Sequence, residues 1–317
     1  MSHNRNKSPK LTSVQLVKKL EQKGVKFNLT NRTEAVKFFK NSNYYFRVTS
    51  YIDNYKSYID KKSRYTNLEF AYLVELSTLD MYLREHIISM CLDIEHCLKV
   101  QLLQDIENNS AEDGYDIVDD FLNQPNKAYV ISDIQRKAHS AYCGGLIRHY
   151  FNSNATNGTG SFDFPVWAFL EVVSFGTFID FYEFYLDKYT QKKHRFSSLF
   201  PYVRSLRNAC AHNNCILHDM FPSSGTKPNK MVENYIRAIP TIKKGMRVNK
   251  LSNRFNLEFV ALLYLFSEIV SDKIREKRIE KLKFFFNNRL QRNMKYFQQN
   301  SIICTNFDFL KKVVDNL

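Results

Sequence analysis

Large apolar residues recur at every third or fourth position along most of the chain, and this spacing predicts helices. The pattern is clearest over residues 11–23, 33–40 and 67–107, where these side chains fall on one face of an α-helix. Thr33 is a candidate N-cap for the second of these helices, because its hydroxyl can accept from a free backbone N–H. In the long third helix Asp80 stands beside Leu79 of the apolar stripe, and a break near residue 80 is a candidate.

Five further segments show the same helical spacing. They are residues 130–149, 164–189, 201–217, 256–270 and 271–297. The segments 108–128, 152–161 and 218–230 are polar or rich in glycine and proline, and they predict connectors. With 9 glycines and 7 prolines in 317 residues, the chain lacks the turn residues that an all-β fold needs. The sequence therefore predicts an all-α protein with bundle-like packing.

Composition along the chain predicts three regions. Residues 1–60 join a basic N-terminal arm to short helices and an aromatic-rich segment. Residues 61–230 contain the central helical bundle, and residues 231–317 form a basic helical region. We therefore expect a bundle with helical extensions at both ends.

The chain carries a strong positive charge, since 46 Lys and Arg against 32 Asp and Glu leave a formal charge of +14. This excess favours an anionic partner. Nucleic acid is the first candidate, because lysine and arginine replace the counterions along phosphates. An anionic membrane surface is the second candidate, and a charge that only keeps the protein in solution is the remaining alternative.

Two groups of residues are candidate RNA contacts. Tyr44, Tyr45 and Arg47 combine aromatic rings with a cation, as proteins that stack single-stranded bases do. In the alternative interpretation, these rings form an aromatic core between the N-terminal helices. The second group lies in the basic C-terminal helix and either follows RNA phosphates or forms a solvated face. It consists of Lys277, Arg278 and Lys281.

Several functional classes lack their motifs in this chain. There is no GxxxxGK[ST] loop, no GxSxG and no HExxH, and the six cysteines show no CxxC pair or zinc-finger spacing. We therefore expect reduced thiols, no metal and no cofactor. The longest apolar stretch, residues 257–266, contains Glu258 and is about half of the roughly 20 residues that a membrane span needs. No signal peptide is visible, so we expect a cytoplasmic protein without a membrane contact.

One segment carries candidate catalytic chemistry. Arg207 and Asn208 are followed by His212 in the pattern R-N-x-x-x-H. Histidine titrates near neutral pH and can take or give a proton, while arginine offers a charged planar fork to phosphate oxygens. RNA supplies its own nucleophile, the 2′-hydroxyl. Such a site can cleave RNA without a metal and leave a 2′,3′-cyclic phosphate and a 5′-hydroxyl end.

Helical geometry constrains this motif. Residues five apart differ by about 140° around an ideal helix, so Arg207 and His212 do not share a face. Asn208, four residues before His212, does share it and is expected to orient the imidazole or contact the same phosphate. Arg207 must reach around a distorted helix, or two protomers must combine their motifs across a two-fold axis. In the structural alternative, Arg207 pairs with a carboxylate and His212 is a core histidine.

An ordered series of sequence blocks resembles the Abi family of bacterial phage-defence proteins, of the AbiD and AbiF type. The series runs over residues 11–217 and fades beyond about residue 230. Its blocks are LTSVQLVKKLEQKGVKF at 11–27, Asn43-Tyr44-Tyr45, Tyr51, Asp80, Leu83-Arg84, Ile94-Glu95-His96, Pro165-Val166-Trp167, Glu171, Ser174-Phe175-Gly176, Leu206-Arg207-Asn208 and Cys210-Ala211-His212. The order of these blocks is more specific than any single block.

The resemblance implies a branch of the HEPN superfamily, whose helical bundles carry an R-x(4–6)-H motif and cleave RNA without metal, usually as dimers. Carried over by position, Arg207 and His212 are catalytic and Asn208 is a polar helper. Glu171 is implied, less directly, as a supporting residue. The sequence after His212, Asn213 to Leu217, departs from the basic or aromatic stretch common in the family, so substrate contacts there are expected to differ.

Together with the predicted all-α fold, the resemblance implies an HEPN-like endoribonuclease of abortive infection. The resemblance further implies a toxin that acts as a homodimer or higher homo-oligomer and is restrained by a structured non-coding RNA. The first alternative is a non-catalytic RNA-binding HEPN protein that holds such an RNA. The second is a regulatory protein whose motif only stabilises a dimer.

Overall fold

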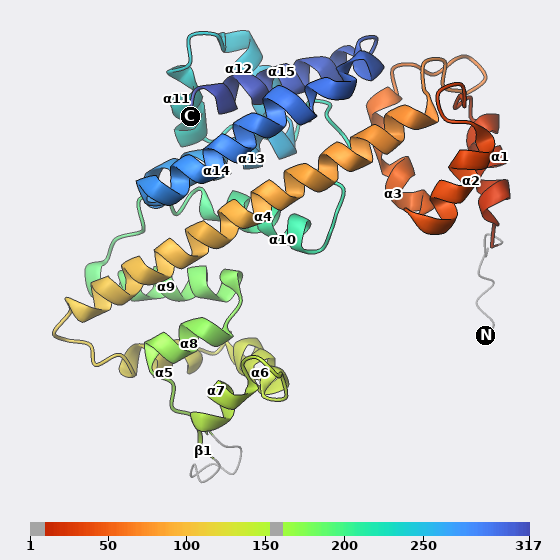
Figure 1. The fold of residues 1–317 in the computed structure, drawn as a ribbon. Helices are drawn as coiled ribbons and strands as arrows, with labels where there is room; N and C mark the ends of the chain where they lie inside the picture. The colour runs from red at the N-terminus through yellow and green to blue at the C-terminus, as the bar shows by residue number, and fades with distance from the viewer. Residues whose placement is uncertain (1–9, 153–160) are drawn as a thin grey trace. The chain divides into compact units, whose positions relative to one another are not determined.

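The computed structural model describes residues 10–152 and 161–317, and its fold is all-α, as predicted (Figure 1). Within these residues, the two strands β1 (Phe151–Asn152) and β2 (Ser161–Phe162) have two residues each and pair with each other in antiparallel orientation. The predicted basic arm at the N-terminus and nearly all of the predicted 152–161 connector lie outside the described residues.

The chain divides into two compact units. One takes the described residues up to 89 with 205–264 and 272–317, and the other takes 90–204 and 265–271. The domain boundaries predicted at residues 60 and 230 do not coincide with these divisions and stay predictions.

Three helices contribute residues to both units: α4 (Phe70–Glu107), α10 (Phe200–Ala211) and α13 (Arg254–Ile269). The first unit also contains α1 (Ser13–Gln22), α2 (Arg32–Asn41), α3 (Tyr45–Thr49), the 3₁₀ helix η1 (Ser50–Tyr55), α11 (Lys230–Arg237), α12 (Lys244–Leu251), α14 (Asp272–Phe284), the π-helical turn η2 (Phe285–Arg289), the 3₁₀ segment η3 (Gln291–Phe297) and α15 (Ser301–Asp315). The second unit contains α5 (Asp116–Leu122), α6 (Ala128–Lys137), α7 (Gly144–His149), β1, β2, α8 (Val166–Val172) and α9 (Phe175–Thr190).

The first two helices begin where side chains satisfy their free N–H groups. The Thr12 hydroxyl accepts from the Gln15 N–H at 3.3 Å, and the Asn31 side chain accepts from the Glu34 N–H at 2.9 Å. Gln15 and Glu34 each return a bond to the cap residue, which completes a capping box. The predicted cap Thr33 is therefore wrong, because Asn31 begins α2 two residues earlier.

The long helix α4 confirms the predicted apolar stripe. Its leucines and isoleucines at the predicted spacing, from Leu73 through Leu83 to Leu102, are all fully buried. The predicted break at Asp80 is wrong, because α4 continues unbroken through this residue. Asp80 is itself fully buried, so its polar side chain needs partners from outside the helix.

Other predicted boundaries also change. The 108–128 connector contains α5, and the predicted 164–189 helix is interrupted where Val173 adopts an extended conformation and Ser174 caps α9. The predicted 271–297 helix ends at Phe284 and continues as η2 and η3. The sequence analysis missed α11, α12 and α15.

The strongly apolar composition of α13 is explained by its burial inside the protein. Nearly every side chain of α13 from Leu257 to Phe266 is buried, including Glu258. None of the helices in the described part of the chain is both long and apolar enough to cross a membrane.

A half-buried histidine in the second unit predicts a pH dependence of stability. His194 packs against the rings of Tyr182, Phe196 and Phe200, and its Nδ1 accepts from the Phe196 N–H at 3.2 Å. Burial lowers the pKa of His194 from 6.5 to about 4. In the unfolded chain the imidazole protonates near pH 6.5, so stability falls as the pH drops from about 6.5 to about 4.

We expect His194→Asn to reduce this slope, by roughly 2 kcal/mol over the interval, in chemical denaturation of the second unit followed at several pH values. The exposed His139 of the same unit supplies the control, since His139→Asn should leave the slope unchanged. Equal slopes for wild type and His194→Asn would contradict the assignment.

Candidate functional site

The R-N-x-x-x-H segment lies at the C-terminal end of α10. The helix ends at Ala211, so the predicted continuation to residue 217 is wrong. Asn213 adopts a left-handed conformation with φ 59° and donates its N–H to the Cys210 carbonyl at 3.0 Å, while the Asn214 N–H bonds to the Ala209 carbonyl at 2.8 Å. This pair of bonds is a Schellman motif, which places His212 at the C-cap of the helix.

The segment after the helix is irregular and yet partly buried. Ile216, Leu217 and Met220 are buried, and buried backbone N–H and C=O groups must find partners. Three asparagine side chains supply many of them. Asn54 donates to the Leu217 carbonyl at 2.9 Å and accepts from the Met220 N–H at 2.8 Å, Asn253 donates to the carbonyls of Asp219 and Phe221, and Asn306 donates to that of Met220.

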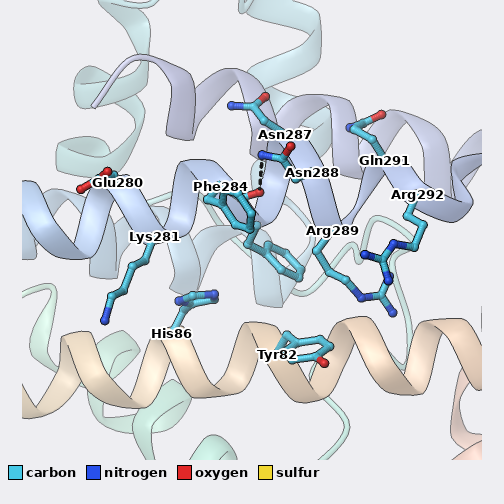
Figure 2. A pocket seen from close by; sticks show the side chains of 11 residues that line it. Tyr82, His86, Glu280, Lys281, Phe284, Asn287, Asn288, Arg289, Gln291 and Arg292 are labelled. Atoms are coloured by element: carbon cyan, nitrogen blue, oxygen red, sulfur yellow. Dashed lines mark hydrogen bonds between the residues drawn. The ribbon is translucent and has the colours of Figure 1, made fainter.

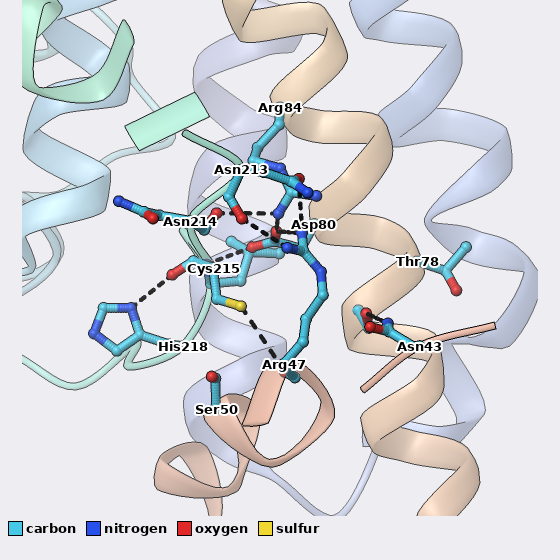
Figure 3. A network of polar contacts seen from close by, with 12 residues as sticks. Asn43, Arg47, Ser50, Thr78, Asp80, Arg84, Asn213, Asn214, Cys215 and His218 are labelled. Carbon is cyan, nitrogen blue, oxygen red and sulfur yellow. Dashed lines mark hydrogen bonds and ion pairs between the residues drawn. The ribbon is translucent and has the colours of Figure 1, made fainter. Parts of the chain in front are cut away.

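A buried charge cluster holds the start of this segment (Figure 3). It consists of Asp80 and Arg84 on α4 and Arg47 on α3, whose exposed fractions are 0%, 5% and 6%, and we call it the Asp80 cluster. The Asp80 carboxylate accepts from the Leu217 N–H at 2.8 Å, pairs with the Arg84 guanidinium, and lies 3.9 Å from Nη2 of Arg47. Burial raises the pKa of the Asp80 carboxyl, and the charge of Arg84 opposes this shift.

The two guanidiniums of the Asp80 cluster also bind the residues directly after His212. Arg47 donates to the Asn213 carbonyl at 2.6 Å and to its side-chain oxygen at 3.2 Å. Arg84 donates to the Asn214 carbonyl at 3.0 Å. The cluster therefore fixes the turn that carries the histidine, and through it the position of the imidazole.

His212 is exposed and lines a pocket of about 520 Å³, which we call the His212 pocket. Other side chains of this pocket are Tyr44, Phe46, Ser50, Asp53 and His218. Tyr44 and Phe46 are 61% and 78% exposed, so their ring faces are open to a ligand. The pocket thus joins open aromatic rings to two imidazoles.

Sequence analysis missed His218. Its Nδ1 lies 2.8 Å from the Cys215 carbonyl, and since a carbonyl can only accept, Nδ1 carries the proton and Nε2 is left as an acceptor. Figure 3 shows this imidazole beside the residues that the Asp80 cluster holds. The signal in the sequence is a second histidine six residues after His212, which the motif does not include.

The structure places the remaining motif residues on α10. The His212 N–H bonds to the Asn208 carbonyl at 2.9 Å, so helical geometry persists to His212 and Arg207 points about 140° away around the axis. Arg207 is half-buried and donates to the Asn208 side chain at 3.4 Å, while Asn208 is exposed. Neither residue is among those that line the His212 pocket in the described chain.

The predicted RNA contacts separate into buried and exposed groups. Tyr44 is open, but Tyr45 is partly covered by the ring of Phe39 at 6.0 Å, as in the aromatic-core alternative. Arg47 is buried in the Asp80 cluster, where it binds protein groups. On α14, Lys277 and Lys281 are exposed and Arg278 is half-buried. Glu171 is exposed on α8 of the second unit, and its supporting role stays a prediction.

The cysteines and candidate metal ligands add no further site. All six cysteines are free thiols, and burial raises the pKa of Cys210, on α10, to about 12. Within residues 10–152 and 161–317, no three His, Cys, Asp or Glu side chains are grouped so that they could hold a metal ion.

Comparison with known proteins identifies one match. The family model for Abi-like proteins matches residues 37–218, which is more than half of the chain. The matched range contains the Asp80 cluster, the R-N-x-x-x-H motif and His218. No curated protein and no solved structure matches the chain.

The Asp80 cluster predicts a large effect of one substitution on stability. In Asp80→Ala two buried guanidiniums lose their counterion, which should lower the free energy of unfolding by about 3–5 kcal/mol. Asp308→Ala is the control, because Asp308 is exposed and pairs with Lys312 four residues later, an arrangement worth less than about 1 kcal/mol. Chemical denaturation of both variants measures the difference, and equal losses would contradict a structural role for Asp80.

Proposed function

We propose, from the premise that this chain belongs to the Abi-like protein family, that it is a metal-independent endoribonuclease. Membership of the family suggests a role in abortive infection, the defence of bacteria against phage. RNA is the proposed partner in two forms, as the substrate and as a structured non-coding RNA that restrains the toxin. The positive charge of the chain, +14, favours both forms of contact.

One observation carries this proposal: the His212 pocket combines a positioned imidazole, a second imidazole and two open aromatic rings. His212 sits on a turn fixed by the Asp80 cluster, and His218 lines the same pocket. Imidazoles transfer protons near neutral pH, and exposed Tyr44 and Phe46 offer faces on which unpaired bases stack.

The reaction follows from two proton transfers. One imidazole takes the proton of the 2′-hydroxyl, whose oxygen then bonds to the adjacent phosphorus. The bond from phosphorus to the 5′ oxygen breaks, and the other imidazole gives a proton to that oxygen. The products are a 2′,3′-cyclic phosphate and a 5′-hydroxyl end. His218, whose Nδ1 donates to the Cys215 carbonyl, suits the base through its other ring nitrogen, which assigns the acid to His212.

Loss of either imidazole should stop cleavage without loss of RNA binding. We expect His212→Ala and His218→Ala each to lower the rate of RNA cleavage by about 10²–10⁴-fold and to remove toxicity on expression. Affinity for a 2′-fluoro RNA, which cannot be cleaved, should stay within about twofold of wild type. His139→Ala, an exposed histidine of the second unit, is the matched control and should leave both properties unchanged.

The competing function, RNA binding without cleavage, predicts the opposite pattern. His212→Ala would then change neither toxicity nor RNA processing. Reversal of charge at Lys277 and Lys281, which are exposed on α14, would be the change that removes activity. Cleavage rates and affinities of the same variants therefore separate the two functions.

The position of Arg207 favours a site shared between two copies. On the α10 helix it points about 140° away from His212, so its guanidinium suits a phosphate held by the His212 of a second copy. Asn208, exposed beside it, suits the same phosphate. We therefore propose that a homodimer has two shared sites, each with Arg207 from one copy and His212 from the other.

Mixing two inactive variants tests the shared site. In a heterodimer of Arg207→Ala with His212→Ala, one of the two shared sites keeps both an arginine and a histidine. Random association then restores about a quarter of the wild-type sites, so co-expression should recover measurable cleavage. The absence of any recovery, with heterodimers verified by affinity tags, would place Arg207 and His212 of the same copy in one site.

A further inference from the structure

A second and larger pocket lies in the first unit, between α4 and the segment from α14 to η3 (Figure 2). Its volume is about 940 Å³, which is in the range of small-molecule sites. Tyr82 and His86 line it from α4, and Lys281, Phe284, Asn288 and Arg292 line it from the other side. We call it the Tyr82 pocket, and it shares no lining residue with the His212 pocket.

The wall opposite α4 is built by a π-helical turn. In η2 the Leu290 N–H donates to the Phe285 carbonyl at 2.9 Å, one residue further back than in an α-helix. Phe285 and Phe286 are both buried by this turn, while the preceding Phe284 is left 65% exposed. Such π-turns occur frequently at functional sites, because they change the direction of the side chains that follow.

Aromatic rings supply stacking surfaces on both sides of the Tyr82 pocket. Tyr82 is 37% exposed, and the Arg289 guanidinium lies 5.5 Å from its ring. The His86 ring packs 5.6 Å from that of Phe285. Burial lowers the pKa of His86, the charge of Glu85 opposes this shift, and Lys281 and Arg278 add to it, so the shift favours the neutral imidazole, which can hydrogen-bond to an uncharged ring.

The polar groups of the pocket match the edges of a nucleobase. Asn288 donates its amide N–H to the Phe284 carbonyl at 3.2 Å, and Gln291 donates to the Phe286 carbonyl at 3.1 Å. Both amide oxygens are therefore left as acceptors. Together with the Glu280 carboxylate, which also lines the pocket, they can accept from the amino and imino groups of a base.

Charges at the pocket suit a phosphate. Arg289 is committed to the Glu75 carboxylate, with Nη2 3.1 Å from Oε2. Lys281 and Arg292 are exposed, and within the described residues neither makes an ion pair. Two cations beside open aromatic rings form the combination by which proteins hold a base and its phosphate.

We propose that the Tyr82 pocket binds a nucleotide, with the base between Tyr82 and Phe284 and the phosphate on Lys281 and Arg292. The nucleotide is either one unit of an RNA strand or a free mononucleotide. This site does not depend on the proposed cleavage reaction, because its residues are separate from the His212 pocket.

Calorimetric titration of the full chain tests the site with two probes. The first is a set of the four nucleoside 5′-monophosphates, each with its nucleoside as a partner without phosphate. The second is a set of 2′-fluoro RNA octamers that cannot be cleaved. Octamer binding that Phe284→Ala weakens, without binding of a monophosphate, identifies an RNA strand as the occupant, and comparable Phe284-dependent binding of a monophosphate identifies a free nucleotide. Binding of neither probe overturns the proposal.

Variants locate the site. Phe284→Ala should weaken binding by about 5–100-fold, and Phe284→Tyr should restore it, because the tyrosine keeps a stacking ring. Lys281→Met and Arg292→Met should weaken the monophosphate more than its nucleoside. Tyr142→Ala, at a fully exposed tyrosine of the second unit, is the control and should bind like wild type. Unchanged binding in Phe284→Ala, at an unchanged thermal midpoint, would overturn the assignment.

His212→Ala separates this inference from the proposed function. It should bind both probes as tightly as wild type, because His212 lines the other pocket. If the wild-type chain fails to cleave RNA and still binds nucleotide through Phe284, only the proposed function fails. If cleavage proceeds while neither probe binds in a Phe284-dependent way, only the Tyr82 pocket assignment fails.

Discussion

A carboxylate removed from water is the constraint on which the first unit depends. Asp80 is fully buried, and its negative charge is stable there only because Arg84, Arg47 and the Leu217 N–H face it. These partners come from three separate stretches of sequence. The guanidiniums in turn bind the carbonyls of Asn213 and Asn214, so a charge inside one helix determines where another helix stops and turns.

This arrangement gives the candidate site a rigid support. The segment after α10 has no regular hydrogen bonds of its own, and side chains such as Asn54, Asn253 and Asn306 satisfy its backbone. A polar network of this kind tolerates little displacement, because each lost bond leaves a buried group unpaired. His212 and His218 therefore project from a fixed loop, which is the condition for precise proton transfer.

The His212 pocket and the Tyr82 pocket, both in the first unit, offer related chemistry for the two proposed tasks. The His212 pocket combines imidazoles with the open rings of Tyr44 and Phe46, which suits proton transfer at a stacked strand. The Tyr82 pocket combines open rings with lysine and arginine, which suits recognition without reaction. Both pockets contain exposed aromatic side chains, and the chain has a charge of +14. A ligand that is both aromatic and anionic matches the rings and the positive charge.

The sequence by itself determined the local features: the all-α class, the apolar stripe of α4, the net charge and the R-N-x-x-x-H motif, because these depend on residues a few positions apart. Only the tertiary structure decided that α10 stops at Ala211. Ile216 and Leu217 continue the apolar spacing of the helix, but they are buried as part of a loop and do not pack as helix residues. It likewise turned Asp80 from a candidate break into a buried ion-pair partner, covered Arg47, and brought His218 into the pocket of His212. Each of these outcomes depends on contacts between distant residues, and periodicity or spacing along one chain carries no information about such partners.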